Sequence, residues 1–339
     1  MSDIRVPSKL NRRRFLTISA SALAGATLAP IAGAAEPRVH RWTGMALGAR
    51  AEINLLLNDP GMAKAMFGEI EAEVRRLEGI FSLYRAESEL VRLNRDGRLS
   101  SPSLEMVELL GLSGQIHDLT EGAFDPTVQP LWDHHAHEAP MPGKGDAGDL
   151  EPILEQVDFA SVVIEPSEIG FRKPGMSITL NGIAQGFITD RIAKLLKSRG
   201  CTDVVVDLGE ISAIGRADIE GDYANDGWPV RLRPDPSRPD AEIKVTLKDA
   251  AVASSARRGT TFDEAARKSH ILDPRTGLPV QSDLEAASVI ANCATIADGL
   301  STAALVMGEA GLVKALNRVR GTSGFVLRAD ESSGWLALS

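Results

Sequence analysis

The sequence predicts an α+β fold in which mixed or antiparallel sheets are flanked by helices. Short apolar runs typical of strands are mixed with amphipathic helical segments, without the regular strand–helix–strand alternation of a doubly wound sheet. Hydrophobic residues make up 43% of the chain, and no internal repeat or low-complexity tract is evident. This composition is typical of a globular domain.

The expected elements follow from periodicity, in chain order. The first half begins with a strand over 40–57, followed by amphipathic helices over 62–80 and 101–120 and a polar loop or lid over 133–151. Strands over 161–165 and 176–180 then precede a helix over 179–200. The second half has expected strands at 203–209, 228–233, 251–258, 269–274 and 286–293, and expected helices at 295–307 and 309–319.

Residues 1–34 have the layout of a cleavable export signal. Basic residues end at Arg14, a mild apolar run covers 15–31, and small residues lead to Ala34. The pair Arg12-Arg13 is the twin-arginine form, which addresses folded proteins for export. An uncleaved anchor is the alternative, but the run is short and rich in Ala, Gly and Ser. We expect cleavage after Ala34, a periplasmic protein, and a single mature domain over 35–339.

The mature chain is acidic. Five basic residues and one acidic residue lie within 1–34, so their removal moves the formal net charge from −9 to −13. This balance argues against nucleic acid and anionic membranes as partners. Cys201 and Cys293 are too few for a disulfide framework, and we expect both to be buried small hydrophobes.

The entrance of the 179–200 helix lacks bulk. Asn181 is a favourable N-cap, and Gly182 and Gly186 leave the backbone open. A helix N-terminus of this kind attracts anions, so a phosphate or diphosphate would fit there. Packing of the helix against a sheet would require the same small residues, and the residues alone leave both interpretations open.

A second candidate lies in the segment "ATIADGLSTAALVMG". Asp298 and Thr302 are four residues apart, so their oxygens share one face of a helix. Such a pair can bind a hard cation such as Mg²⁺. The alternative is an Asp that favours the helix dipole and a Thr that bonds back to a carbonyl.

Histidines supply two further candidates. His270, in "KSHILDPRTGLPV", could be a general base or a structural histidine. The "HHAH" run over 134–137 could bind a borderline metal, but it lies in the expected polar loop without cysteines.

Six blocks, in order, resemble the ApbE family of FAD:protein FMN transferases. They are "FSLYRAESELVRLN" (81–94), "GAFDPTV" (122–128), "LNGIAQGF" (180–187), "VVDLGEISAIG" (205–215), "SHILDPRTG" (269–277) and "IADGLSTAALVMG" (296–308). The resemblance spans about 40–330 and implies a two-lobed, T-fold-like α+β architecture. It also implies a Mg²⁺-dependent transfer of FMN from FAD to a Thr or Ser hydroxyl of another protein, with release of AMP.

The resemblance also assigns residues. It implies Mg²⁺ ligation by Asp298, Thr302 and the Gly182 carbonyl, and His270 as the base for the acceptor hydroxyl. The remaining residues are implied contacts of FAD: Leu47, Tyr84, Ala123, Phe124, Asp125, Thr179, Gln185 and Leu272.

The chain departs from the family pattern at the helix entrance. Thr179 stands where the family has an Asp, Asn181 where it has a Gly, and Gln185 where it has a Lys. The negative charge of the Asp and the positive charge of the Lys are absent together, so their losses can compensate, and Thr and Gln keep hydrogen-bonding capacity. The twin-arginine signal with "LNGIAQG" is similar to the exported branch exemplified by NosX, whose acceptor would be a NosR-like or other membrane redox protein. A non-catalytic flavin carrier and an FAD pyrophosphatase remain alternatives.

Overall fold

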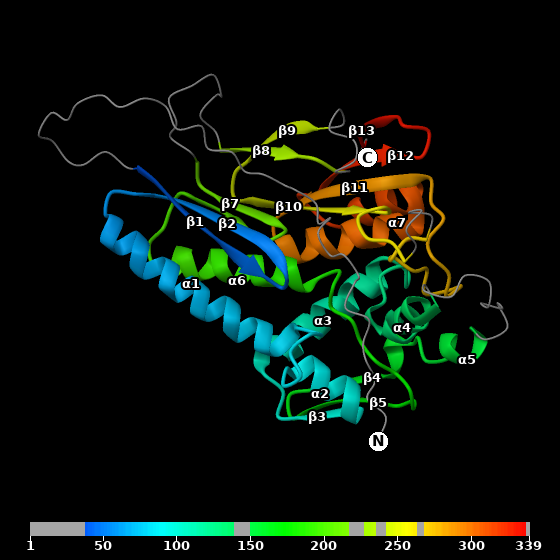
Figure 1. The fold of residues 1–339 in the computed structure, drawn as a ribbon. Helices are drawn as coiled ribbons and strands as arrows, with labels where there is room; N and C mark the ends of the chain where they lie inside the picture. The colour runs from blue at the N-terminus through cyan, green and yellow to red at the C-terminus, as the bar shows by residue number, and fades with distance from the viewer. Residues whose placement is uncertain (1–37, 139–149, 217–226, 235–241, 263–267, 337–339) are drawn as a thin grey trace, which may run out of the picture.

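The computed structural model describes residues 38–138, 150–216, 227–234, 242–262 and 268–336. The predicted export signal, residues 1–34, lies outside them. In the described part, an antiparallel eight-stranded sheet is covered on one face by three long helices (Figure 1). The α+β prediction with antiparallel sheets is confirmed.

The large sheet collects strands from both ends of the chain. Its order is β1-β2-β6-β7-β10-β11-β12-β13, and each neighbouring pair is antiparallel. The bounds are β1 Arg38–Ala46, β2 Ala49–Leu57, β6 Val204–Asp207, β7 Ile211–Ile214, β10 Ala250–Ala256, β11 Leu284–Ala291, β12 Ser323–Arg328 and β13 Ser333–Trp335.

The main core lies between this sheet and the helices α1 (Pro60–Phe81), α6 (Ala184–Ser198) and α7 (Ala294–Leu316). Their apolar faces supply fully buried residues such as Ile70, Ile192 and Leu305. Among the described residues, α7 is the one helix long and apolar enough to cross a membrane. It packs against α6, β10 and β11, so it is the central helix of the core.

A two-stranded sheet covers part of the opposite face. It consists of β8 (Trp228–Leu232) and β9 (Ile243–Leu247), and Trp228 packs there on Val205 and Val252. Strand alternation therefore gives β10 two buried faces, which explains its near-continuous apolar sequence.

The remaining elements lie below and to the right of α1 and α6 in Figure 1. They are α2 (Glu89–Asp96), α3 (Leu104–Leu119), a 3₁₀ turn at Pro126–Val128, α4 (Gln129–Glu138), α5 (Glu151–Leu154), a 3₁₀ turn at Phe159–Ser161, and the sheet of β3 (Arg98–Ser100), β5 (Glu168–Phe171) and β4 (Val162–Glu165).

Several predicted boundaries are wrong. The 40–57 strand is a hairpin, because Leu47 and Gly48 adopt positive φ angles of 47° and 82°. Residues 176–180 are extended but unpaired with a sheet, and 269–274 form only isolated bridges at Ser269 and Leu272. The two predicted C-terminal helices are confirmed as the two helical segments of α7, which break at Gly308, where φ is 72°.

Candidate active site

The N-terminal halves of α6 and α7 lie against each other at a glycine. A Cβ atom on Gly186 would lie 2.4 Å from the carbonyl oxygen of Ala294 and 2.9 Å from Cβ of Asp298. Only a residue without a side chain permits this approach. Gly186 is therefore required for close packing, as one interpretation predicted, but its neighbour is helix α7 rather than a sheet.

The entrance of α6 differs from the prediction. The helix begins at Ala184, its cap residue is Ile183, and no side chain caps it. Asn181 is exposed and lies in a turn before the helix, so the predicted N-cap is wrong. The tertiary contacts decide this boundary, because Leu180 and Ile183 are buried and anchor the turn.

Gly182 lies against α7. A Cβ atom placed on it would be 3.0 Å from both Oγ1 and Cγ2 of Thr302. Asp298 is on the same face of α7, one turn earlier, and its Oδ2 accepts a hydrogen bond of 3.0 Å from the Gly186 N–H. The structure thus brings the three predicted metal-binding residues to one place.

The chemistry of this place suits a hard cation. Asp298 is 4% exposed, and its Oδ1 accepts no hydrogen bond from the described residues. Burial raises the pKa of Asp298 to about 7. Among the described residues, no three His, Cys, Asp or Glu side chains form a metal cluster. A cation here would therefore combine one carboxylate with hydroxyl, carbonyl and phosphate oxygens, a pattern typical of Mg²⁺.

Glu210 is a second buried carboxylate in the same cavity, and the sequence analysis missed it. It is 5% exposed, and its Oε2 accepts the Ser254 N–H at 3.2 Å. Burial and the neighbouring charge of Asp298 raise its pKa well above the usual range. Because two carboxylates this close repel each other when ionised, a cation would relieve the repulsion.

His270 lines the same cavity. Its Nδ1 lies 2.7 Å from the carbonyl oxygen of Thr260. A carbonyl only accepts, so Nδ1 carries the proton and Nε2 has a free lone pair. Burial lowers the pKa of His270, which keeps the ring neutral. This is the state that a general base requires.

The cavity gathers most of the residues that the sequence analysis selected. Its lining includes Ala123, Phe124, Asp125, Thr179, Gly182, Gln185, His270, Leu272, Asp298 and Thr302. Leu47 and Tyr84 do not line it. Leu47 lies in the β1–β2 turn, where its N–H donates to Glu78 at 2.9 Å, and Tyr84 is 57% exposed after α1.

Two of the polar wall residues already have protein partners. Asp125 accepts the N–H and hydroxyl of Thr127 and lies 3.6 Å from Nε2 of His117. Gln185 reaches the turn after β6, where its Nε2 is 3.5 Å from the Leu208 carbonyl oxygen. Gln185, which stands where the family pattern has a lysine, thus contacts the Leu208 turn.

The "HHAH" run belongs to helix α4 rather than to a polar loop. His135 is buried and lies 2.7 Å from the Gly277 carbonyl oxygen, while His137 bonds the Asp133 carbonyl. His134 lies 3.5 Å from Glu138. These contacts are structural, and the rest of the predicted loop, 139–149, lies outside the described residues.

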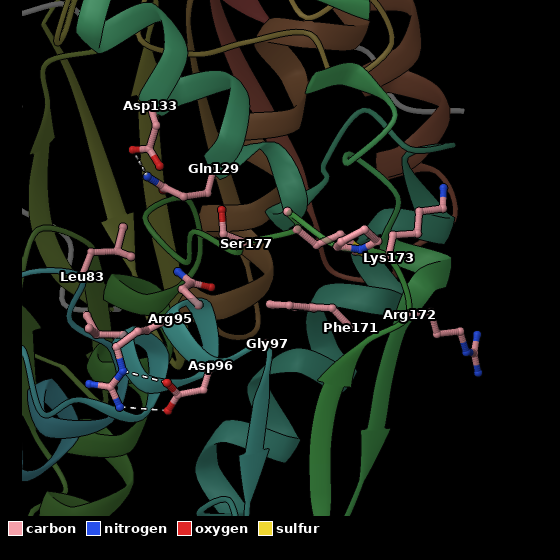
Figure 2. A pocket seen from close by; sticks show the side chains of 15 residues that line it. Leu83, Arg95, Asp96, Gly97, Gln129, Asp133, Phe171, Arg172, Lys173 and Ser177 are labelled. Carbon is pink, nitrogen blue, oxygen red and sulfur yellow. Dashed lines mark hydrogen bonds and ion pairs between the residues drawn. The ribbon is translucent and has the colours of Figure 1, made fainter. Parts of the chain in front are cut away.

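A larger cavity, of about 770 Å³, lies between α2, the end of β5 and the start of α4 (Figure 2). Its charged residues largely pair with protein groups. Arg95 binds Asp96, and Gln129 donates to Asp133 at 2.8 Å. Figure 2 shows Arg172 directed away from the cavity. None of the predicted catalytic or metal-binding residues lines this larger cavity.

Asp190, also missed by the sequence analysis, joins the two site helices. Cys293 precedes α7 without capping it, and the Asp190 carboxylate of α6 accepts the N–H groups of Ala294 and Thr295 at 2.7 and 2.8 Å instead. The cap comes from a residue 104 positions away, so no local signal reveals it. Cys201 is buried beside Met66, Cys293 is half-buried, and both are free thiols.

Comparisons with known proteins agree with this geometry. The model of the ApbE family matches residues 47–326. A curated relative from Vibrio cholerae, named FAD:protein FMN transferase, is 29% identical over 308 residues and covers 84% of this chain and 86% of its own length. The solved flavin transferase ApbE from Vibrio cholerae superposes with a TM-score of 0.77 at 24% identity, covering 89% of this chain and 98% of its own.

A second solved structure, the apo form of the Pseudomonas stutzeri flavinyl transferase ApbE, gives a TM-score of 0.76 at 24% identity, covering 90% of this chain and 96% of its own. These structures show that the fold is the one found in ApbE flavin transferases. Because the family model covers most of the sequence, the chain belongs to the ApbE family.

Proposed function

We propose that this protein is an FAD:protein FMN transferase. It would transfer the FMN moiety of FAD to a Thr or Ser hydroxyl of an acceptor protein in a Mg²⁺-dependent reaction that releases AMP. Family membership and the relatives named FAD:protein FMN transferase support this activity. The observation that carries it is the single cavity lined by Asp298, Thr302, Gly182 and a neutral His270.

The cavity residues have two chemical roles, cation binding and proton transfer. Asp298, Thr302 and the Gly182 backbone would hold Mg²⁺, which would neutralise the charge that develops on the diphosphate. Nε2 of His270 accepts the proton of the acceptor hydroxyl. The hydroxyl oxygen bonds to the FMN phosphorus, the P–O–P bond breaks, and AMP leaves with the bonding electron pair.

The cavity walls would hold FAD. Phe124 and Leu272 offer buried apolar surface, and Gly182 leaves room for phosphate oxygens near the backbone. Leu47, in the β1–β2 turn, and Tyr84, just after α1, would contact a part of FAD that extends beyond the cavity. The Thr179 and Gln185 side chains are neutral. Recognition of the diphosphate would therefore depend on Mg²⁺, because Gln185 replaces the lysine of the family pattern.

The decisive experiment is a transfer assay with FAD, Mg²⁺ and a protein acceptor of a characterised family member. We expect a covalently fluorescent acceptor and one AMP per label. Asp298→Ala should abolish labelling, while circular dichroism shows an intact fold. FAD bound without turnover would indicate a carrier, and FMN plus AMP without acceptor would indicate a pyrophosphatase. Either result would contradict the transferase.

The proposal includes export. The twin-arginine segment over 1–34 would direct the folded enzyme to the periplasm, leaving a mature domain over 35–339. The acceptor would then be an exported or membrane-bound electron-transfer protein. N-terminal sequencing of the periplasmic protein should begin at Ala35, and an unprocessed chain in the membrane fraction would contradict cleavage.

A further inference from the structure

The Thr302 hydroxyl belongs to a chain of three hydroxyl groups. Oγ of Ser255, on β10, is 3.2 Å from Oγ1 of Thr302 and 2.9 Å from Oγ of Ser301. Ser301 in turn donates to the carbonyl oxygen of Asp298 at 3.0 Å. The chain therefore connects the Thr302 hydroxyl, through Ser255 of the neighbouring strand, to the backbone carbonyl of Asp298.

The end of this chain determines its direction. The Asp298 carbonyl can only accept, so Ser301 uses its single hydroxyl proton there. The contact between Ser255 and Ser301 must then use the proton of Ser255. The contact between Thr302 and Ser255 must in turn use the proton of Thr302.

The consequence concerns the lone pairs of Thr302. Its proton points towards Ser255, so its free lone pairs point away from β10. Gly182, which lines the cavity, lies against this same hydroxyl. A cation binds a neutral hydroxyl through a lone pair, so a proton aimed into the cavity would oppose binding. Partners of this kind orient ligands at many metal sites.

We propose that Ser255 is a positioning residue that fixes the Thr302 hydroxyl in its cation-binding orientation. This assignment rests on the cation site of the proposed function. Ser301, which is fully buried, anchors the other end of the chain and keeps Ser255 from rotating. In this role Ser255 acts through the Thr302 hydroxyl.

The test measures cation binding rather than turnover. Mn²⁺ is titrated into the full chain with FAD present and acceptor absent, and the free Mn²⁺ signal is followed by electron paramagnetic resonance. We expect Ser255→Ala to weaken Mn²⁺ binding by about 10- to 100-fold. Ser255→Thr, which keeps the hydroxyl, should bind nearly as the wild type does.

A double-mutant cycle separates positioning from a general structural effect. If Ser255 acts through Thr302, Ser255→Ala should weaken Mn²⁺ binding no further in a Thr302→Ala background. Ser288→Ala is the matched control, because Ser288 is 1% exposed and forms a similar serine–serine contact of 2.7 Å with Ser254. It should leave Mn²⁺ binding unchanged.

Three results would overturn the proposal: an unchanged Mn²⁺ affinity in Ser255→Ala, an equal loss in the Thr302→Ala background, or a wild-type protein that binds no Mn²⁺. The last would also remove the cation site. Failure of transfer to an acceptor, with these binding differences intact, would instead count against the proposed function alone.

Discussion

At the scale of single residues, the neighbour of His270 decides how it can react. The Thr260 carbonyl holds the proton on Nδ1, and burial lowers the pKa of the ring. A base must be unprotonated, and this one loses its proton below the usual histidine pKa. We therefore expect the acid limb of the kcat–pH profile to lie below about pH 6.5.

His270→Gln should lower kcat by about 10²- to 10⁴-fold, the usual contribution of a general base, and should remove the acid limb. The glutamine amide can still donate to the Thr260 carbonyl, so the fold should remain. An unchanged kcat, or an acid limb that persists in His270→Gln, would show that another group takes the proton.

Sequence reasoning at this scale succeeded where a residue has its own chemical signature. The Asp298–Thr302 spacing predicted a shared helix face, the family resemblance added Gly182, and the structure places all three together. Glu210 and Ser255 had no such signature, because an isolated Glu or Ser in a strand region is ordinary. Only the fold, which brings the β6–β7 turn and β10 to the cavity lined by α6 and α7, shows that these two face it.

At the scale of elements, the glycines of the α6 entrance have separable roles. Gly186→Ala would place Cβ 2.4 Å from the Ala294 carbonyl oxygen, which is backbone and cannot easily move. We expect a loss of about 1–3 kcal/mol in the free energy of unfolding. Gly182→Ala meets only the Thr302 side chain, at 3.0 Å, so it should weaken Mg²⁺ binding more than stability.

Denaturant unfolding and Mg²⁺ titration of both variants measure this difference. Gly68→Ala is the control, because Gly68 is exposed within α1 and a Cβ atom there would meet open space. This change should stabilise the protein by roughly 0.5–1 kcal/mol. If Gly182→Ala destabilised as much as Gly186→Ala and left Mg²⁺ binding intact, the separation would be wrong.

Element boundaries were harder to predict than element types. The 62–80 helix and the 228–233 strand agree with α1 and β8 to within a few residues, because their apolar periodicity is strong. The N-cap at Asn181 was wrong because buried Leu180 and Ile183 decide where α6 begins. The cap of α7 comes from Asp190, which local sequence patterns cannot show.

At the scale of the whole molecule, the strand order exceeds what periodicity can predict. β2 pairs with β6, and about 145 residues separate the two strands. Alternation identifies a strand and its buried face but not its neighbour, so the α+β class was predictable and the strand order was not. The resemblance supplied the architecture, since it spans nearly all of the described chain.

The same long-range assembly predicts that ligands stabilise the molecule cooperatively. The walls of the cavity come from α6, α7, β10 and the segment around His270, so a ligand that bridges them opposes global unfolding. We expect Mg²⁺ and FAD together to raise Tm by more than the sum of their separate effects, because the diphosphate completes the cation's oxygen ligands. A ligand that binds only the folded state, at a free concentration one hundred times its Kd, adds about 2.7 kcal/mol to the free energy of unfolding. In Asp298→Ala the cooperative part should vanish while the effect of FAD alone remains. Differential scanning calorimetry with EDTA, Mg²⁺, FAD and both measures each contribution, and purely additive shifts in the wild type would show that cation and dinucleotide do not meet in this cavity.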